Sequence, residues 1–155
     1  MTVYYRECLE KGNQYQDFVC DQLWRNYHIS IGVYSSKKWQ FEKGESASGI
    51  EIKFDGKLEQ TGNLYIEVAE KSNPEFEEYI PSGIFRDDNT WLYLIGNYKE
   101  AYLFPKKWLK AICTDEKKIK TQQMKPVQIA TSKGFLLPAQ IACRNMICIR
   151  KFIFQ

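Results

Sequence analysis

Apolar and polar positions alternate most clearly in two segments, residues 49–55 and 63–70. A polar stretch that contains Gly56 and Gly62 connects the two segments. Successive side chains of a strand point to opposite faces of the sheet. Both segments are therefore predicted to be strands that place their apolar side chains on one face and most of their charged side chains on the other. In the first segment the apolar face would carry Ile50, Ile52 and Phe54, and the charged face Glu51, Lys53 and Asp55.

The remaining pattern predicts helices and further strands on both sides of these segments. Apolar residues at three- and four-residue spacing predict a helix over residues 7–27, with Asn13 as an alternative start. Pro105 suits the first position of a second helix that ends near Cys113. Strands are expected at 28–34, 91–95 and 101–104, the last two as a hairpin, with an extended segment at 131–137 and no assignment for 138–154.

Length and composition fit one globular domain. The chain has 155 residues, of which 44% are hydrophobic and 26% charged, so it can bury a core. The expected fold class is α/β (α+β), with a central mixed sheet, a β-hairpin at its core and flanking helices. The predicted domain spans residues 1–155, with its core at about 10–113 and a C-terminal extension at 114–155.

Charge and cysteine content add expectations about partners and environment. The net charge of +3 does not by itself indicate nucleic-acid binding, although seven lysines fall between Lys106 and Lys125. We expect Lys106, Lys107 and Lys110 either to contact a nucleic-acid backbone or to form the solvated face of their helix. The five cysteines form no CxxC pair, which favours free thiols in the cytoplasm. No leader segment or membrane span is predicted.

If the two alternating segments formed a hairpin, Asp55 would lie opposite Glu67, and Glu51 opposite Lys71. Opposed side chains have Cβ atoms about 5 Å apart, so two carboxylates there would repel one another unless a cation lay between them. Mg²⁺ prefers such oxygen ligands. The alternative is an ordinary surface with cross-strand ion pairs, each worth about 0.2–1 kcal/mol. Glu45, Glu51, Asp55 and Glu67 are therefore candidate metal ligands.

The ordered motifs resemble the restriction-endonuclease-like PD-(D/E)XK nuclease superfamily, and in particular its short phage-type and bacterial members. The resemblance rests on Gly44-Glu45-Ser46, Gly49-Ile50-Glu51-Ile52-Lys53-Phe54-Asp55, Thr61-Gly62-Asn63-Leu64-Tyr65-Ile66-Glu67, Ala69-Glu70-Lys71 and Pro81-Ser82-Gly83-Ile84. It implies a restriction-endonuclease-like fold and Mg²⁺-dependent hydrolysis of DNA, with Mn²⁺ as a substitute metal. Asp55 or Glu51 would be the first metal ligand and Glu67 the second.

The sequence departs from the superfamily where a lysine is usual, because Ala69 stands two residues after Glu67. A β-bulge at Ala69-Glu70 would bring Lys71 back toward Glu67, and otherwise Lys53 would assist water attack on phosphorus. A second alignment uses Glu51-Ile52-Lys53 as the acid-x-lysine motif, with Glu45 upstream. Lys53, Lys71 and Glu51 are therefore the candidate catalytic residues.

Other candidate residues have more ordinary explanations. Glu10, Gln16 or Asp17 on the first helix would add a ligand if the resemblance holds, although solvent-facing helix polarity also explains them. A hydrogen-bonded or surface role suits His28 better than catalysis, and a turn explains Asp87-Asp88-Asn89 better than a cation site. The leading hypothesis is a Mg²⁺-dependent nuclease acting on DNA, with a homodimer possible. The alternative is a non-catalytic nucleic-acid- or protein-binding module that keeps a degenerate nuclease fold.

Overall fold

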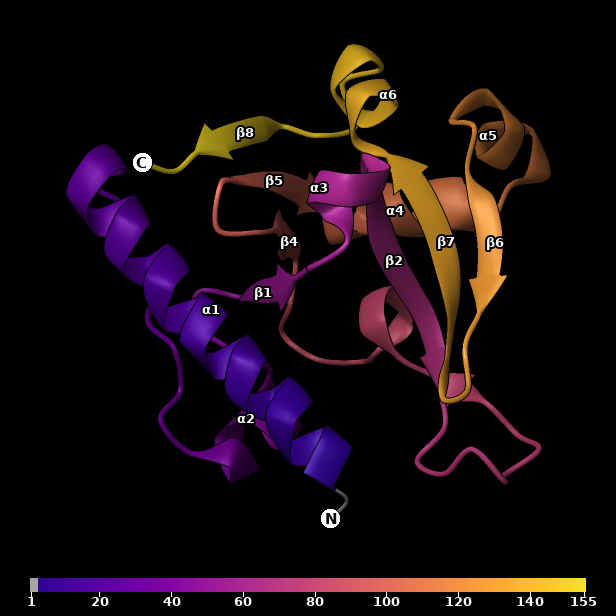
Figure 1. Ribbon diagram of the computed structural model, residues 1–155, viewed down its shortest axis with the longest axis horizontal. Helices are drawn as coiled ribbons and strands as arrows, with labels where there is room; N and C mark the ends of the chain where they lie inside the picture. The colour runs from indigo at the N-terminus through magenta and orange to yellow at the C-terminus, as the bar shows by residue number, and fades with distance from the viewer. Residues whose placement is uncertain (1–2) are drawn as a thin grey trace. The chain divides into compact units, whose positions relative to one another are not determined.

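The computed structural model describes residues 3–155, without the side chains of residues 3–6, 8, 37 and 41. It contains α-helices and two four-stranded sheets, so the chain is a mixed α and β protein (Figure 1). The chain forms two compact units. Unit 1 comprises residues 1–56, 88–103 and 150–155, and unit 2 comprises residues 57–87 and 104–149.

Unit 1 contains the sheet with strand order β1-β4-β5-β8. β1 pairs in parallel with β4, so that Ile52 lies beside Leu94, and β5 pairs antiparallel with β8. The helices α1 and α2 belong to the same unit. The bounds are α1 Val3–Tyr27, α2 Lys37–Lys43, β1 Ile50–Phe54, β4 Leu92–Gly96, β5 Glu100–Pro105 and β8 Arg150–Ile153, with the last two residues of β5 counted in unit 2.

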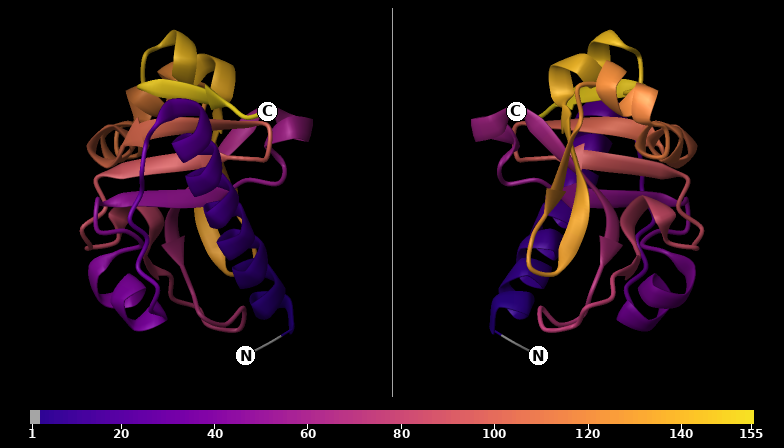
Figure 2. Two further views of the ribbon diagram at one scale, coloured as in Figure 1. Left: turned by 90° about the vertical axis from the view of Figure 1, so that its left-hand side faces the viewer. Right: turned by 90° about the vertical axis from the view of Figure 1, so that its right-hand side faces the viewer.

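The core of unit 1 lies between α1 and this sheet, and Figure 2 shows α1 running across the strands. Tyr15, Val19 and Leu23 recur every four residues on α1 and are buried, as one face of an amphipathic helix should be. They pack with side chains from all four strands, among them Ile52 of β1 and Phe152 of β8. β4 is buried at all five positions, which is typical of a strand covered on both faces.

Unit 2 contains the sheet with strand order β3-β2-β7-β6, in which every pairing is antiparallel. β2 and β7 form its long central pair, and their register shifts between Glu67 and Ala69. Leu64 and Ile66 alternate as buried residues along β2. The bounds are α3 Leu58–Thr61, β2 Asn63–Glu70, β3 Ile80–Pro81, η1 Gly83–Phe85, α4 Lys106–Cys113, α5 Glu116–Thr121, β6 Lys125–Gln128, β7 Ser132–Pro138 and α6 Ala139–Arg144.

Most elements match the local pattern of the sequence. The predicted helices at 7–27 and 105–113 correspond to α1 and α4, and the strands expected at 49–55 and 63–70 correspond to β1 and β2. The prediction of a strand at 28–34 is wrong, because this segment contributes only an isolated bridge between Val33 and Ser46. The unassigned C-terminal segment contains α6 and β8, whereas α2, α3, α5 and β6 were not anticipated.

The predicted pairing of the two alternating segments is wrong. β1 pairs with β4, which lies about forty residues further along the chain, and β2 pairs with β3 and β7. The segment between β1 and β2 folds as α3, whose C-cap Gly62 is left-handed at φ 68°. A helix at that position replaces the tight turn that a two-stranded hairpin requires. The hairpin expected at 91–104 is consistent with β4 and β5 being neighbours.

Two further expectations concern the membrane and the cysteines. None of the helices within residues 3–155 is long and apolar enough to span a membrane. Cys20, Cys113, Cys143 and Cys148 form no disulfide bond with one another, as predicted, and the side chain of Cys8 lies outside the described part. Burial raises the pKa of the Cys113 thiol to about 12. The prediction of a single domain stays a prediction.

Candidate functional site

The first candidate site is an acid–lysine pair on β1, formed by Glu51 and Lys53. These residues are two apart on one strand, so their side chains share a face. Lys53 Nζ lies 2.6 Å from Glu51 Oε1. The Glu51 side chain is only 7% exposed, whereas that of Lys53 is 43% exposed. The predicted charged face is therefore confirmed for this pair, but it is buried at Glu51 rather than facing solvent.

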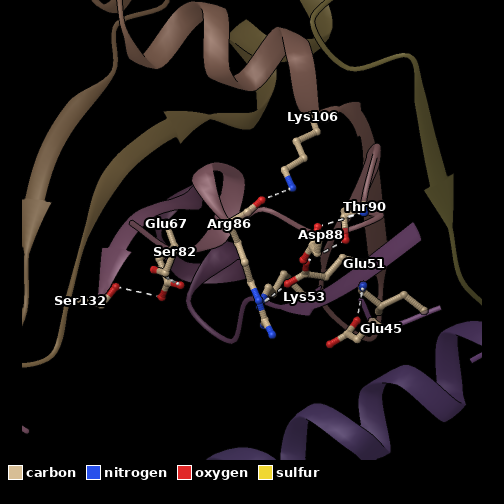
Figure 3. Close-up of polar contacts among 11 residues, drawn as sticks. Glu45, Glu51, Lys53, Glu67, Ser82, Arg86, Asp88, Thr90, Lys106 and Ser132 are labelled. Carbon is tan, nitrogen blue, oxygen red and sulfur yellow. Dashed lines mark hydrogen bonds and ion pairs between the residues drawn. The ribbon is translucent and has the colours of Figure 1, made fainter. Parts of the chain in front are cut away.

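Thr90 links this pair to a second carboxylate that the sequence analysis set aside. The Thr90 hydroxyl donates to Glu51 Oε2 at 3.4 Å, and the Thr90 N–H donates to Asp88 Oδ1 at 2.9 Å. Figure 3 shows Glu51, Lys53, Asp88 and Thr90 together. Asp88 precedes β4, which pairs in parallel with β1, and Thr90 between Asp88 and β4 bonds to both carboxylates. Because alternation cannot reveal that pairing, the sequence favoured a turn over a cation site at Asp88.

Glu45 and Ser46 form hydrogen bonds along β1, which is an edge strand of its sheet. Glu45 Oε2 accepts a hydrogen bond from the Ile52 N–H at 2.9 Å. The Ser46 hydroxyl is 2.8 Å from both the N–H and the carbonyl oxygen of Ile50. The motif Gly44-Glu45-Ser46 therefore supplies partners for backbone groups that an edge strand would leave unpaired.

Asp55 lies at the end of the same strand and is 9% exposed. Its N–H donates to the carbonyl oxygen of Gly96 at 2.7 Å.

Burial raises the pKa of Tyr15 above its usual range, and the nearby Tyr98 and Asp55 raise it further. The Tyr15 hydroxyl and the Gln16 amide nitrogen are buried without a hydrogen-bond partner in the described part of the chain. Tyr15 therefore stays protonated near neutral pH.

The second candidate site surrounds Glu67 on β2, in unit 2. Ser82 Oγ donates to Glu67 Oε1 at 2.9 Å, and Ser132 Oγ donates to Glu67 Oε2 at 3.0 Å (Figure 3). Both serines are buried, and the Tyr65 hydroxyl also bonds to Ser132. Each oxygen of the Glu67 carboxylate therefore accepts a hydrogen bond from a serine, which fixes its orientation.

Gly83 allows the chain to pass close to Glu67. Its φ is +52°, and a Cβ atom placed there would lie 2.9 Å from the Glu67 carbonyl carbon and closer still to its oxygen. Only glycine adopts this geometry without strain. The Ser82-Gly83 motif and Glu67 thus form one local structure, although fifteen residues separate Ser82 from Glu67.

Lys71 does not interact with Glu67 in the way that the bulge hypothesis required. A register shift does occur between Glu67 and Ala69. The Lys71 ammonium donates instead to the carbonyl oxygens of Pro74 and Phe76, at 2.7 Å in both cases. It also lies 4.9 Å from the ring centroid of Tyr79. In this structure Lys71 holds the loop that follows β2.

The structure does not build the expected cross-strand pairs Asp55–Glu67 and Glu51–Lys71. β1 and β2 belong to different sheets and to different compact units. Alternation along β1 places Glu51 beside Lys53, whereas strand pairing does not set Asp55 opposite Glu67. Within residues 3–155, no three His, Cys, Asp or Glu side chains form a group that could hold a metal ion.

The three lysines expected to contact nucleic acid differ in their surroundings. Lys106 is 6% exposed and donates to the Arg86 carbonyl oxygen at 2.6 Å, so it does not share the solvated face of α4. Lys107 is exposed, and Lys110 is half-buried with its ammonium 5.8 Å from the ring centroid of Phe85. A phosphate contact stays a prediction for these three lysines, of which Lys107 is the exposed one.

The other candidate side chains lie mainly on the surface. Glu10, Asp17 and His28 are exposed, whereas Gln16 is 7% exposed. His28 has a positive φ of 56° just beyond the end of α1, and its ring contacts that of Trp24 edge-on.

No protein-family model matches the chain, and neither the curated proteins nor the solved structures compared with it include a match.

Proposed function

We propose that this protein is a metal-dependent nuclease that hydrolyses phosphodiester bonds in DNA, and that Glu51 and Lys53 belong to its reaction centre. The observation that carries the proposal is the buried Glu51 carboxylate beside a partly exposed lysine, 2.6 Å away on the same strand. This pair is the acid-x-lysine motif of the second alignment, and it lies entirely within unit 1.

The local structure of the resembling motifs also supports the proposal. Glu45 and Ser46 bond to the backbone of β1, next to Glu51 and Lys53. Ser82 bonds to Glu67, the acid of the other motif group. Within each unit, members of this set of motifs thus bond to one another or to the strand that carries the acid, Glu45 and Ser46 to β1 and Ser82 to Glu67.

Glu51 and Asp88 are the residues that suit a divalent cation best. Mg²⁺ is commonly held by one or two carboxylates, while water and substrate phosphate complete its coordination. Both carboxylates bond to Thr90, so they provide hard oxygen donors close together. Such a cation would supply charge stabilisation at the phosphate. Lys53 extends from the buried pair toward solvent, where its ammonium can orient a water or a phosphate oxygen.

A nuclease assay with matched variants tests this proposal. The purified protein is incubated with plasmid and single-stranded DNA in Mg²⁺ or Mn²⁺, beside Glu51→Gln, Lys53→Met and the control Lys38→Met. Lys38 is exposed on α2, and its Nζ lies 4.0 Å from Glu42 Oε1. We expect cleavage by the wild type and Lys38→Met, and a loss of at least about 100-fold in the other two variants. Equal background nicking by all four proteins would reject hydrolysis.

The second candidate function is a non-catalytic binding module. It is favoured by the Glu67 carboxylate, whose two oxygens accept serine hydrogen bonds, and by Lys71, which bonds to loop carbonyl groups. Both residues then serve the structure of unit 2 rather than chemistry. A cation that binds only the native state raises the melting temperature. A melting temperature unchanged by millimolar Mn²⁺, together with absent cleavage, would favour this function.

A further inference from the structure

Unit 2 carries a shallow groove between α4, α5 and the end of α6, with a volume of about 360 Å³. Its lining is partly apolar and partly polar. Trp108 and Ile112 come from α4, Lys118 and Gln122 from α5 and its C-terminus, and Asn145 and Met146 from the segment after α6. Trp108 is 39% exposed and Met146 is 78% exposed, so two large side chains of the groove remain accessible to a ligand.

The chain around the groove is strongly basic. Residues 106–125 contain seven lysines against Asp115 and Glu116, a net charge of +5 in a chain whose total is +3. All of these lysines except Lys106 are exposed or half-buried. Asp115 is engaged as the N-cap of α5, where its side chain accepts hydrogen bonds from the N–H groups of Lys117 and Lys118. The local field therefore favours a negatively charged ligand.

The polar groups of the groove together with the exposed indole of Trp108 match nucleobases. Asn145 Nδ2 donates to Gln122 Oε1 at 2.7 Å, which leaves the Gln122 amide nitrogen and the Asn145 carbonyl oxygen as a donor and an acceptor. Base edges present donors and acceptors together. An indole face next to lysines provides stacking and phosphate contacts, the combination that binds single strands. A duplex keeps its bases stacked on one another and offers no free face to Trp108.

We infer that this groove binds single-stranded nucleic acid, with a base stacked on Trp108 and the phosphate backbone near Lys118. The inference deepens the proposed function by naming the form of nucleic acid, and it rests on that proposal only for the class of substrate. Binding here requires neither Glu51 nor a metal ion. The groove would hold a strand whether or not the protein cleaves it.

Fluorescence anisotropy with the full-length protein tests the inference in EDTA, which prevents metal-dependent cleavage. The probes are a labelled thymidine oligonucleotide of about 12 nucleotides and a labelled duplex of the same length. The variants are Trp108→Ala, Lys118→Glu and Met146→Glu. Trp24→Ala is the control for loss of an exposed tryptophan, since Trp24 is 60% exposed and lies in unit 1. Lys120→Glu changes the charge equally on α5 but does not line the groove.

We expect the wild type to prefer the single strand and Trp108→Ala to weaken binding about 5- to 150-fold. Lys118→Glu and Met146→Glu should weaken it more than Lys120→Glu, whereas Trp24→Ala should bind like the wild type. Met146 is so exposed that its variant tests the groove even if Trp108→Ala fails to fold. Binding is measured in EDTA and at a groove that lies within unit 2, so a protein without nuclease activity can still satisfy this inference.

Three outcomes would overturn the inference. The first is an absence of binding by the wild type. The second is equal affinity of the wild type and all three groove variants for the single strand, because binding would then depend on net charge alone. The third is displacement of the oligonucleotide by polyglutamate at equal charge concentration, which would assign the groove to an acidic polypeptide.

Discussion

Lys53 neutralises the Glu51 carboxylate from two residues further along the same strand, with 2.6 Å between Nζ and Oε1. The two ends of this ion pair are in different environments, because the glutamate is buried and the lysine is partly exposed. A buried carboxylate is costly without a partner, whereas an exposed ammonium is not. The pair is therefore asymmetric, and its two members should respond differently to replacement.

We expect Lys53→Met to destabilise the protein by about 1–3 kcal/mol, because it leaves the buried Glu51 carboxylate without its cation. Glu51→Gln should cost less, since the remaining Lys53 ammonium can be hydrated. Urea unfolding followed by circular dichroism measures both values. Equal losses for the two variants would contradict the asymmetry, and Lys38→Met serves as the surface control.

Gly83 should tolerate substitution less well than Gly62, although both have a positive φ. The φ angles are +52° at Gly83 and +68° at Gly62, but only Gly83 lies against other atoms, those of Glu67. A left-handed alanine costs about 1–2 kcal/mol by itself, and Gly62→Ala should show this cost alone. We expect Gly83→Ala to show a clearly larger loss, measured as the free energy of unfolding. Similar losses would mean that Gly83 does not pack against Glu67.

Lys106 and Lys107 are neighbours with opposite environments, so they form a matched pair for mutation. Lys106→Met removes a buried ammonium that donates to the Arg86 carbonyl oxygen, and we expect a loss of about 1–3 kcal/mol. Lys107→Met changes an exposed side chain and should stay within about 0.5 kcal/mol of the wild type. Thermal denaturation of both variants makes the comparison. A larger effect at Lys107 would contradict the burial of Lys106.

Cys113 should be the least reactive of the four described thiols. Burial raises its pKa to about 12, from 9.0 for an ordinary cysteine, and the thiolate is the reactive form. Cys143 is exposed and should react with a disulfide reagent at pH 8 within the mixing time. Cys113 should react only as the protein opens. Rapid labelling of Cys113 in the native protein would contradict this order.

The same shift makes stability depend on alkaline pH. Because the folded pKa lies above the unfolded pKa, the native state holds this proton more tightly. The resulting stabilisation is complete below about pH 9 and is lost as the pH rises toward 12. Cys113→Ala should therefore show a flatter decline in stability over this range than the wild type, with Cys143→Ala as the control. Parallel curves for all three proteins would exclude Cys113 as a contributor.

The sequence alone determined the elements whose evidence is local. Repeated apolar spacing predicted α1, Pro105 marked the start of α4, and alternation predicted β1 and β2. Alternation also placed Glu51 and Lys53 on one face, where they form their ion pair. These features follow from the backbone geometry of a single segment, so no knowledge of its neighbours was needed to find them.

Only the tertiary structure decided which strands pair and which charged groups are buried. β1 and β2 carry the same alternating pattern, so adjacency in sequence suggested a hairpin, yet β1 pairs with β4 and β2 with β7. That choice positioned Asp88 near Glu51 and left Asp55 and Glu67 in separate sheets. The physical reason is that alternation shows which face of a strand is apolar but not which strand lies beside it. Strands pair through backbone N–H and C=O groups, and nearly every residue carries these groups, so they do not identify the partner strand.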